Sequence, residues 1–537
     1  MNWRIATICS HVLLHFVVYL QKILVMLVKT FGYAVQGITA TKVIVEVNIG
    51  QGVNFFIVGL PDSAVKESQQ RLYAALRNNN FSIPGKQITV NMAPADIRKE
   101  GSAYDLTIAI GVLAASEHIT LENIDKYAIM GELALDGEIR PIKGCLPIAI
   151  KAKEDGFKGL ILPSQNAAEA AVVEGLEVYS ADHINHVVKF FNSGIGLEKI
   201  TIDVSETFSN KLNDTTFDFS DVKGQENIKR ALEIAAAGGH NAILIGPPGA
   251  GKTMLSKRMP SILPPLTVEE ALETTKIHSV AGKTVRQSGL ITQRPFRNPH
   301  HTISDVALVG GGNNPQPGEI SLAHNGVLFL DELPEFKRSV LEVMRQPLED
   351  RTVTISRARF SVEYPASFML VASMNPCPCG YYNHPEKNCV CGPGVVQKYL
   401  TKISGPLLDR IDLHVEVTPV PFNELSNKQS AEPSKNIRER VIAARLIQTL
   451  RFAGLPGIYN NAQMHTKELK TYCSLNAAGN TLLKNAMEKL GLSARAYDRI
   501  LKVARTIADL DTSADILPNH IAEAIQYRSL DRDGWAG

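Results

Sequence analysis

The chain has 537 residues, a formal net charge of +2 and a hydrophobic fraction of 45%. At about 150 residues per domain, this length predicts roughly three to four domains. The near-zero charge excludes a protein that coats nucleic acid with its whole surface, so a nucleic-acid contact needs a local basic patch. Seven cysteines in a chain of this length do not indicate a disulfide-rich scaffold. We therefore expect a multi-domain globular protein of a reducing compartment, the cytoplasm.

The amino-terminal segment Ile5–Leu20 is apolar and follows Arg4. It is shorter than the roughly 20 residues that a membrane-spanning helix needs, and no small-residue cleavage site follows it. A signal or anchor is one interpretation. We favour a leader upstream of the true start, with the folded protein beginning at Met26. We expect no stable membrane partner, because no other stretch is apolar enough to cross a bilayer.

Strand and helix patterns alternate through the first part of the chain. Alternation with a period of two predicts strands at Thr41–Val47 and Gln87–Met92. Helical patterns occupy Asp62–Asn78, where Ser63 is the expected N-cap, and Leu106–Ser116, an apolar run of small residues. The mixture predicts one α/β domain.

Two polar breaks divide the rest of the chain. Ile202–Asp221 is polar and aperiodic, which predicts a linker. Beyond it, Glu226–Gly238 is helical and Asn241–Ile245 is a buried strand. Asn423–Lys435 is the second break. A helical pattern at Asn436–Phe452 follows it, and the remainder of the chain is also helical in pattern. The predicted segments are an apolar leader (1–25), a first α/β domain (26–200), a linker (201–220), a second α/β domain (221–422), a linker (423–435) and a helical domain (436–530).

The segment Gly246–Thr253, GPPGAGKT, matches the phosphate-binding pattern GxxxxGK[ST]. Its glycines let backbone N–H groups turn toward the phosphates, its lysine would reach the β- and γ-phosphates, and its threonine would ligate Mg²⁺. A strand pattern precedes the segment and a helical pattern, Met254–Met259, follows it, as this motif requires. The alternative is a fortuitous glycine turn. The residues predicted to bind the nucleotide are Gly246, Gly249, Gly251, Lys252 and Thr253.

The segment Gly326–Glu332, GVLFLDE, predicts a strand that is buried on both faces and ends in two carboxylates. In a P-loop ATPase the first carboxylate, Asp331, holds Mg²⁺ and the second, Glu332, polarises the attacking water. A further apolar strand, Phe368–Ala372, leads to Asn375, whose amide can bind the γ-phosphate or that water. An ordinary strand ending in acidic residues is the alternative. The combination predicts binding of ATP and Mg²⁺, and ATP hydrolysis.

Four further segments resemble the magnesium-chelatase-like branch of the AAA+ superfamily: Arg297–His301, Gly310–Gly312, Pro317–Gly326 and Ser404–Arg410. With a Lon-type domain in front, residues 26 to 528 resemble the ComM/YifB family of bacterial competence-associated AAA+ proteins. The resemblance implies a Lon-protease-type α/β domain, a P-loop AAA+ domain with a parallel sheet, and a carboxy-terminal helical lid. It also implies a hexameric, ATP-driven motor on single-stranded or branched DNA. Such a motor promotes branch migration, a helicase activity, when incoming DNA recombines during natural transformation.

The resemblance assigns two arginines. Arg410, in the sequence LLDR, matches the arginine finger that reaches the γ-phosphate of a neighbouring subunit, and Arg495, in LSARAY, matches the sensor 2 arginine of the lid. Asn375 matches sensor 1. An arginine supplied by a neighbour makes hydrolysis depend on ring assembly. A surface salt bridge is the alternative role for both arginines.

The segment Arg351–Tyr364 alternates like a β-hairpin and carries Arg357 and Arg359 without an acidic neighbour until Glu363. AAA+ motors of the branch that it resembles have a hairpin that projects into the ring pore. Arginines there could hold DNA phosphates, so Arg357 and Arg359 are the candidate DNA-binding residues. The alternative is a solvated hairpin whose charges protect a sheet edge.

Four thiols lie within the loop 377–391, at Cys377, Cys379, Cys389 and Cys391. Four thiolates suit tetrahedral Zn²⁺ and leave no open coordination position, so a bound zinc ion would be structural. The C-x-C spacing is tighter than the usual two to four intervening residues. A reduced loop without metal is the alternative.

The first domain resembles the Lon proteolytic domain at Lys99–Asp105 and around Gly131–Gly144. Lon-type cleavage needs a serine that a lysine activates. Alignment places Ala103 at the serine position and Leu146 at the lysine position, while Ser102 and Lys143 are displaced. We therefore expect a protease fold that has lost its activity.

A magnesium-chelatase-type ATPase subunit for metal insertion is the alternative function. Chelatases of this group add an adhesion domain with a DxSxS motif, and the nearest match here, Asp203–Thr207, lies in the predicted linker. A scaffold that only binds ATP would not need Glu332, Asn375 and Arg410.

Overall fold

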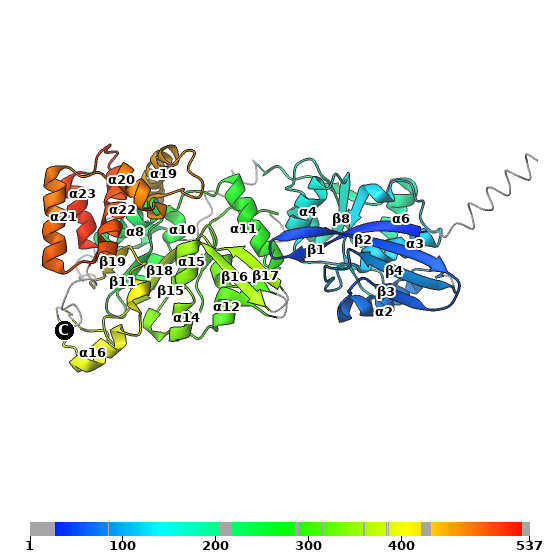
Figure 1. Cartoon of the computed structure of the whole chain (residues 1–537), viewed down its shortest axis with the longest axis horizontal. Coiled ribbons are helices and arrows are strands. Elements are labelled where there is room, and N and C mark those ends of the chain that lie inside the picture. The colour runs from blue at the N-terminus through cyan, green and yellow to red at the C-terminus, as the bar shows by residue number, and fades with distance from the viewer. Residues whose placement is uncertain are drawn as a thin grey trace, which may run out of the picture. The chain divides into compact units, whose positions relative to one another are not determined.

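The computed structural model describes residues 27–83, 85–204, 217–284, 289–312, 315–357, 360–382, 384, 386–419 and 431–528 (Figure 1). The predicted apolar leader, much of the first predicted linker and the start of the second lie outside these residues. The chain forms two compact units. The first comprises residues up to 207 together with 275–291, and the second comprises residues 208–274 and 292 onward. The domain boundaries predicted from the sequence stay predictions.

The first unit is built on an eight-stranded sheet with the strand order β10-β9-β8-β5-β1-β2-β4-β3. Both strands predicted from alternation are confirmed, and the inward side chains Val43, Val45, Ile88 and Val90 have no exposed surface. The strands are β1 (Leu27–Gln36), β2 (Thr39–Gly50), β3 (Phe55–Val58), β4 (Gln87–Ala93), β5 (Tyr127–Ile129), β8 (Gly159–Pro163), β9 (Glu177–Ala181) and β10 (Glu198–Ile200), with a separate pair, β6 (Glu132–Leu133) and β7 (Ile139–Arg140).

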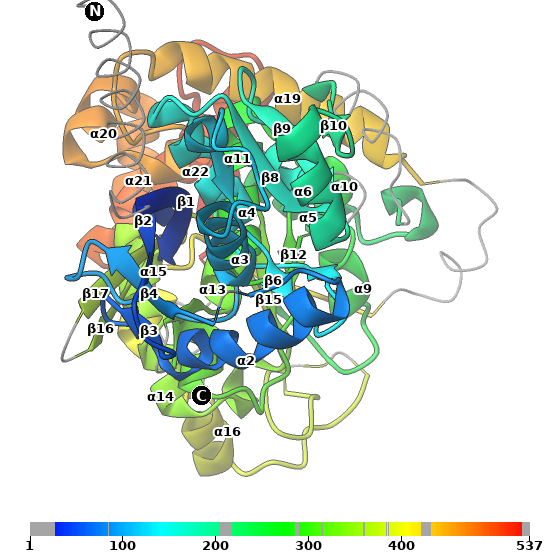
Figure 2. The same ribbon diagram turned by 90° about the vertical axis from the view of Figure 1, so that its right-hand side faces the viewer.

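Helix α3 (Asp105–Ala115) is buried along its whole length against β1 and β2 (Figure 2). Gly111 permits this close approach, because a Cβ there would lie 2.7 Å from Val47. Helix α2 (Ser63–Asn78) is capped by Asp62, which accepts a hydrogen bond from the Val65 amide at 2.8 Å. The prediction of Ser63 as the cap is wrong by one residue. The other helices are α4 (Cys145–Glu154), α5 (Ser164–Ala170) and α6 (Ile184–Ser193).

The second unit contains a five-stranded sheet with the order β12-β15-β18-β11-β19, in which every pair is parallel. The carboxyl ends of parallel strands share one edge of the sheet, and their amino ends share the other. The three central strands are wholly buried, as their apolar sequences predicted. The strands are β12 (Phe296–Arg297), β15 (Val327–Leu330), β18 (Met369–Met374), β11 (Ala242–Ile245) and β19 (Leu413–Glu416).

The helix predicted at Met254–Met259 is interrupted. Helix α9 (Lys252–Ser256) ends after five residues and α10 (Met259–Ile262) begins anew. Pro260 explains the break, because it has no N–H and its ring excludes a continuous helix through the preceding turn. Phe219, in the predicted linker, is fully buried in the core of this unit, so ordered structure begins before residue 221.

The predicted helical character of the carboxy-terminal part is confirmed. The helices there, drawn in orange and red in Figure 1, are α19 (Ser434–Arg451), α20 (Thr466–Tyr472), α21 (Ala477–Leu490), α22 (Ala494–Leu510) and α23 (Pro518–Gln526). Helices α19 and α22 pack on α8 (Glu226–Gly238), which has the bounds predicted from the sequence and is followed by the left-handed Gly239. Within the described residues, every helix is too short or too polar to cross a bilayer.

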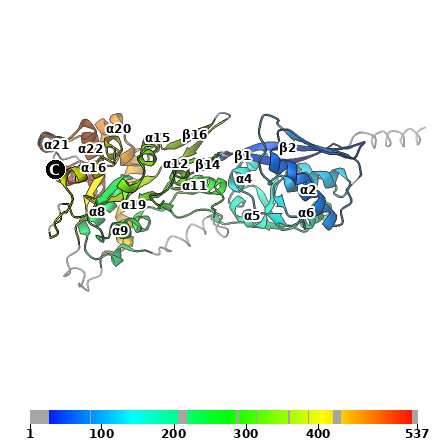
Figure 3. The ribbon, with the colours of Figure 1, turned by 90° about the horizontal axis from the view of Figure 1, so that it is seen from below.

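The predicted hairpin is also confirmed. Strand β16 (Thr352–Arg357) pairs with β17 (Phe360–Pro365) in antiparallel register and stands out from its unit (Figure 3). Its base is anchored because the Tyr364 hydroxyl donates to Pro315 O at 2.7 Å. A Cβ on Gly310 would lie 2.8 Å from Ile355, so this glycine permits close packing beneath the hairpin.

Candidate nucleotide site

The loop between β11 and α9 has the backbone that a phosphate-binding loop needs. Gly249 and Gly251 have φ angles of +79° and +85°, which disfavour any residue with a side chain. A Cβ on Gly246 would lie 2.3 Å from Val417 O, so this glycine allows the chain that leaves β19 to pass close to the loop. Lys252 is buried and its amine donates to Gly246 O at 2.7 Å and to Pro247 O at 2.9 Å.

Lys252 joins the loop to the end of β18. Its amine donates to Asn375 Oδ1 at 3.0 Å, and the Gly246 amide donates to Met374 O at 3.2 Å. Burial lowers the pKa of Lys252, and the negative charges of Asp331 and Glu332 oppose that shift. A cation held among oxygen atoms is suited to bind phosphate.

The carboxylate of Asp331 is oriented by two hydroxyl groups. Thr253 donates to its Oδ2 at 2.7 Å, and Ser373 donates to its Oδ1. Thr253 and Asp331, from separate segments, thus place two oxygen ligands side by side, which is the chemistry that Mg²⁺ prefers. The residues fit the ion that the sequence predicts.

Glu332 follows Asp331 in a left-handed conformation, with φ +56° and ψ +50°. Such a conformation costs about 1–3 kcal/mol in a residue other than glycine and persists only where its surroundings impose it. The Glu332 amide donates to Ser373 Oγ at 3.4 Å, and its Oε2 lies 3.6 Å from Nδ1 of His301. His301 also stacks on His300, with ring centroids 4.1 Å apart.

Arg410 lies at the other edge of the same sheet. Asn241 directly precedes β11, and its side-chain amide donates to Arg410 O at 2.9 Å. The nucleotide loop follows β11, a strand of four residues that spans about 13 Å at 3.3 Å per residue. The Arg410 guanidinium donates to Pro406 O at 2.6 Å and pairs with Glu349.

Arg495 lies beside Arg410 and not beside Lys252. It is the second residue of α22 and donates to Asp409 Oδ2 at 2.7 Å. Its side chain is 70% exposed. The structure therefore brings together the predicted residues at Gly246–Thr253, Asp331, Glu332 and Asn375, and separates them from Arg410 and Arg495.

A buried polar network stabilises the edge of the sheet near Arg410. Asp412 accepts from Arg499 at 2.8 Å and pairs with Nδ1 of His240 at 3.1 Å. His240 contacts the Thr506 hydroxyl at 2.8 Å through its other ring nitrogen. Burial alone would raise the pKa of Asp412, but Arg499 and His240 hold it well below its usual range. The network joins the lid helix α22 to the sheet.

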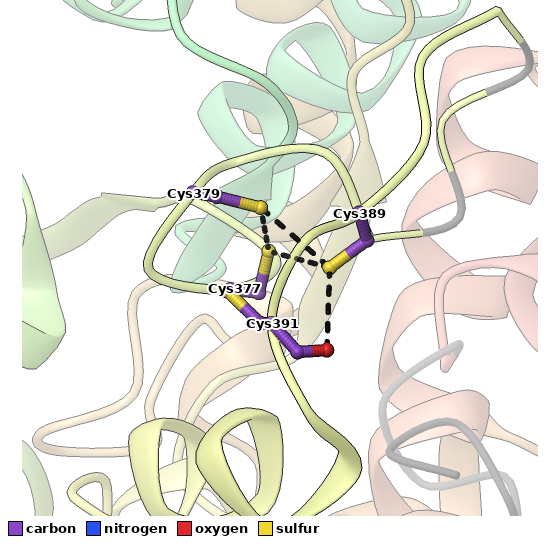
Figure 4. A group of neighbouring side chains, drawn as sticks. All are labelled: Cys377, Cys379, Cys389 and Cys391. Atoms are coloured by element: carbon purple, nitrogen blue, oxygen red, sulfur yellow. Dashed lines mark hydrogen bonds between the residues drawn. The ribbon is translucent and has the colours of Figure 1, made fainter.

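The four predicted thiols converge in a single cluster (Figure 4). The Cys377 sulfur lies 3.3 Å from that of Cys379 and 3.6 Å from that of Cys389, and all four sulfurs lie within 4.8 Å of one another. All four are free thiols. A hydrogen bond from the Tyr381 backbone lowers the pKa of Cys379. In Cys389 and Cys391 a backbone hydrogen bond also lowers the pKa, but desolvation and the neighbouring thiols raise it by more.

The predicted DNA-binding arginines are described only in part. Arg357 pairs with Phe360 at the end of the hairpin, and its side chain, like the whole of Arg359, lies outside the described residues. Arg351, at the hairpin base, is partly buried, and burial lowers its pKa to about 10.

In the first unit, Ser102 donates to the carboxylate of Glu132. A Lon-type serine nucleophile needs a lysine to activate it, and the partner of Ser102 here is a carboxylate instead. The aliphatic chain of Lys143 covers Gly282, where a Cβ would lie 2.9 Å from Cε. Loss of protease activity stays a prediction.

Comparison with known proteins shows the family. Residues 218–425 match "Magnesium chelatase, subunit ChlI", residues 45–166 match "Subunit ChlI of Mg-chelatase" and residues 431–528 match "Magnesium chelatase, subunit ChlI C-terminal". The competence protein ComM of Haemophilus influenzae is 45% identical over 504 residues, 94% of this chain and 97% of that protein. The chain belongs to the ComM/YifB family. The uncharacterized protein YifB of Salmonella typhimurium is 44% identical over 502 residues, 93% of this chain and 96% of that protein.

A second similarity concerns a smaller part of the chain. Lon protease 2 of Bacillus subtilis is 32% identical over 176 residues, 30% of this chain and 30% of that protein. Together with the parallel-sheet unit and the helical carboxy-terminal part, it confirms the predicted fold class. The ComM/YifB family and its AAA+ domain support an ATPase that uses ATP and Mg²⁺.

Sequence reasoning missed two contributors to this ComM/YifB nucleotide site. Ser373 orients Asp331, and its place two residues before Asn375 could have indicated this role. His301 faces Glu332 and stacks on His300, and no role was assigned to it from the sequence. Arg297, in the same segment, binds Glu319 through two hydrogen bonds of 2.5 and 2.8 Å.

Proposed function

We propose that the protein is an ATP-hydrolysing AAA+ ring, a homo-hexamer that moves on single-stranded or branched DNA and promotes branch migration during recombination in natural transformation. The observation that carries the ring is the position of Arg410 and Arg495. Both lie at the amino edge of the sheet, and the nucleotide residues of the same chain lie at the carboxyl edge. These arginines therefore act on nucleotide held by a neighbouring subunit.

In this proposal each residue of the site has a distinct task. Lys252 and the glycine backbone bind the β- and γ-phosphates, while Thr253 and Asp331 hold Mg²⁺, which neutralises phosphate charge. Glu332 accepts a proton from the attacking water as the bond between the γ-phosphorus and ADP breaks. Asn375, held 3.0 Å from Lys252, orients the γ-phosphate or that water. The neighbour's arginines stabilise the charge of the transition state.

Contact with DNA is assigned to the β16–β17 hairpin. One face of it is buried through Val353, Ile355 and Tyr364, and the opposite face is exposed at Thr354 and Ser356. A hairpin anchored at its base can carry Arg357 and Arg359 to phosphate as the nucleotide state changes. The name of the Haemophilus relative, a competence protein, supports DNA as the partner.

We also assign Zn²⁺ to the four-thiol cluster. A tetrahedral site with Zn–S bonds of about 2.3 Å has sulfur–sulfur edges of about 3.8 Å, and the closest sulfurs here lie 3.3, 3.5 and 3.6 Å apart. The cytoplasm is the proposed location, because a reducing compartment keeps such thiols available.

A metal-insertion ATPase is the second candidate. It is favoured by the similarity of all three matched regions to magnesium-chelatase subunits. Stimulation by porphyrin would favour this candidate, and stimulation by DNA would favour the motor.

The test is ATP hydrolysis by the full chain with no DNA, with single-stranded DNA and with forked DNA. We expect DNA to stimulate turnover and Glu332→Gln to abolish it while ATP still binds, because only the residue that polarises water is changed. Turnover indifferent to every DNA would reject the DNA motor and leave the ATPase. Turnover retained by Glu332→Gln would reject the assigned mechanism.

A further inference from the structure

The thiol loop lies directly against the phosphate-binding loop. Gly380, one residue after Cys379, is so close to Pro248 that a Cβ on it would lie 2.5 Å from Pro248 Cδ. Gly380 has a φ angle of +85°, which also favours glycine. Proline is rigid, so Pro248 cannot move aside as a flexible side chain would. The cysteine loop therefore supports the phosphate-binding loop from outside.

The same loop is continuous with the residue that contacts Lys252. Cys377 follows Asn375 by two positions, and Asn375 accepts from the Lys252 amine at 3.0 Å. The thiol loop consequently contacts the nucleotide site at two points: through Asn375 at its start and through Gly380 within it. Displacement of this loop would disturb both contacts.

The thiols are the groups that can hold this loop closed. Cys379 and Cys389 are separated by nine residues, yet their sulfurs lie 3.5 Å apart. Backbone hydrogen bonds of the described part of the loop are local, for example Gly380 N to Cys377 O at 3.0 Å. Closing such a loop costs conformational entropy, which metal ligation can offset.

We propose that Zn²⁺ bound by Cys377, Cys379, Cys389 and Cys391 clamps the phosphate-binding loop, so that metal loading controls affinity for ATP. The inference rests on the proposed nucleotide and zinc sites and adds a coupling between them. The ion replaces the protons of the four thiols, which are released to solvent, and no oxidation or reduction takes place. An apo loop would no longer hold Pro248 and Asn375 in place.

The experiment measures zinc content and the Kd of a fluorescent ATP analogue on the full-length protein. We expect one zinc ion per chain in the parent. Cys389→Ser/Cys391→Ser should lose the zinc and weaken nucleotide binding by about tenfold or more. Gly380→Ala should keep the zinc, because all four thiols remain, and still weaken nucleotide binding by about tenfold, because its Cβ displaces Pro248.

Two glycines provide matched controls. Gly392→Ala lies next to Cys391, has an ordinary φ of −67° and would meet no atom within 4 Å. Gly454→Ala has a φ of +84°, nearly that of Gly380, and its Cβ would also meet no atom within 4 Å. The first controls for position in the loop, and the second for backbone strain. Both should retain zinc and parental ATP affinity.

The outcomes separate this inference from the motor. Metal-free parent protein with tight ATP binding would overturn the clamp, as would a Gly380→Ala variant that binds ATP as Gly454→Ala does. A parent that binds no ATP would overturn the clamp together with the nucleotide site. If ATP affinity depends on zinc but DNA does not stimulate ATP hydrolysis, the clamp is supported and only the DNA motor is rejected.

Discussion

Arg495 donates a hydrogen bond to Asp409 at 2.7 Å, which places the lid arginine beside the residue that precedes Arg410. The backbone of Arg410 is in turn bound by Asn241, at the start of β11. Lys252 lies beyond the other end of that strand. The two arginines therefore lie near the amino end of β11, the end opposite to Lys252.

This arrangement predicts complementation between defective subunits. Lys252→Ala and Arg410→Ala should each reduce ATP hydrolysis by about 10³-fold or more, because one loses phosphate binding and the other loses the arginine finger. A mixture should regain activity, since an Arg410→Ala subunit can receive the intact arginine of a Lys252→Ala neighbour. Steady-state turnover of mixtures at several ratios measures this.

A mixture of Lys252→Ala with Glu332→Gln is the matched control for that experiment. Both substitutions damage the site of their own chain, so no pairing of these subunits creates an intact site. Recovery in this control, or none in the first mixture, would contradict action in trans.

Ser373 should determine how tightly Mg²⁺ is held. Ser373→Ala removes a hydroxyl that orients Asp331, and loss of such a supporting partner typically weakens metal binding by about 10–100-fold. We expect ATP hydrolysis to need more Mg²⁺ and to approach the parental rate at saturation. The exposed Ser339→Ala, on α14 (Arg338–Glu342), should leave the Mg²⁺ titration unchanged.

Asp412 should be essential for stability. It is 1% exposed and binds both Arg499 and His240, so Asp412→Ala leaves the partly buried Arg499 guanidinium without its carboxylate partner. The expected loss is about 3–5 kcal/mol of unfolding free energy. Glu488→Ala is the control, since its pair with Lys484 spans 3.9 Å between largely exposed side chains and contributes about 0–1 kcal/mol. Thermal unfolding followed by circular dichroism compares them, and equal shifts would refute the role of Asp412.

Buried histidines predict a loss of stability in mild acid. Burial lowers the pKa of His240, of His414 and of His520 below the usual value near 6.5. When the pH falls below about 6.5, the unfolded chain binds protons that the folded chain does not. The unfolding free energy should then fall by up to about 1.4 kcal/mol per pH unit for each histidine.

Thermal unfolding between about pH 7.5 and pH 5 measures this dependence. His414→Leu, on β19, removes one of these three groups and should reduce the slope by about a third. An unchanged slope in that variant would exclude His414 as a source of acid sensitivity.

The hairpin arginines should matter for DNA and not for basal turnover. Arg357→Ala/Arg359→Ala is expected to abolish DNA stimulation of ATP hydrolysis. It should also reduce the salt dependence of single-strand binding by about 0.7 in logarithmic slope for each lost contact. Lys467→Ala/Lys470→Ala, two exposed cations on α20, is the control. If DNA still stimulates ATP hydrolysis in the arginine variant, the hairpin does not bind DNA and is only a solvated edge of the protein.

Much of the nucleotide site follows from local sequence. Gly246–Thr253 determines its own loop, since its glycines are needed at positive φ or close approach. Asp331 and Asn375 end apolar strands, and parallel strands bring their carboxyl ends to one edge. Local patterns predicted the ends of helices less well. Asp62 rather than Ser63 caps α2, and Pro260 ends the helix predicted at Met254–Met259 early.

The sequence alone determined which residues could bind ATP, Mg²⁺ and zinc, because those motifs are contiguous and their chemistry follows from residue type. Only the tertiary structure decided which edge of the sheet carries Arg410 and Arg495, because that depends on how α22 packs on α8 and pairs with Asp409 and Asp412, which precede β19. It alone placed Gly380 against Pro248, residues 132 positions apart in the chain. Contacts between distant segments depend on the order of strands and the packing between layers, which no local periodicity encodes.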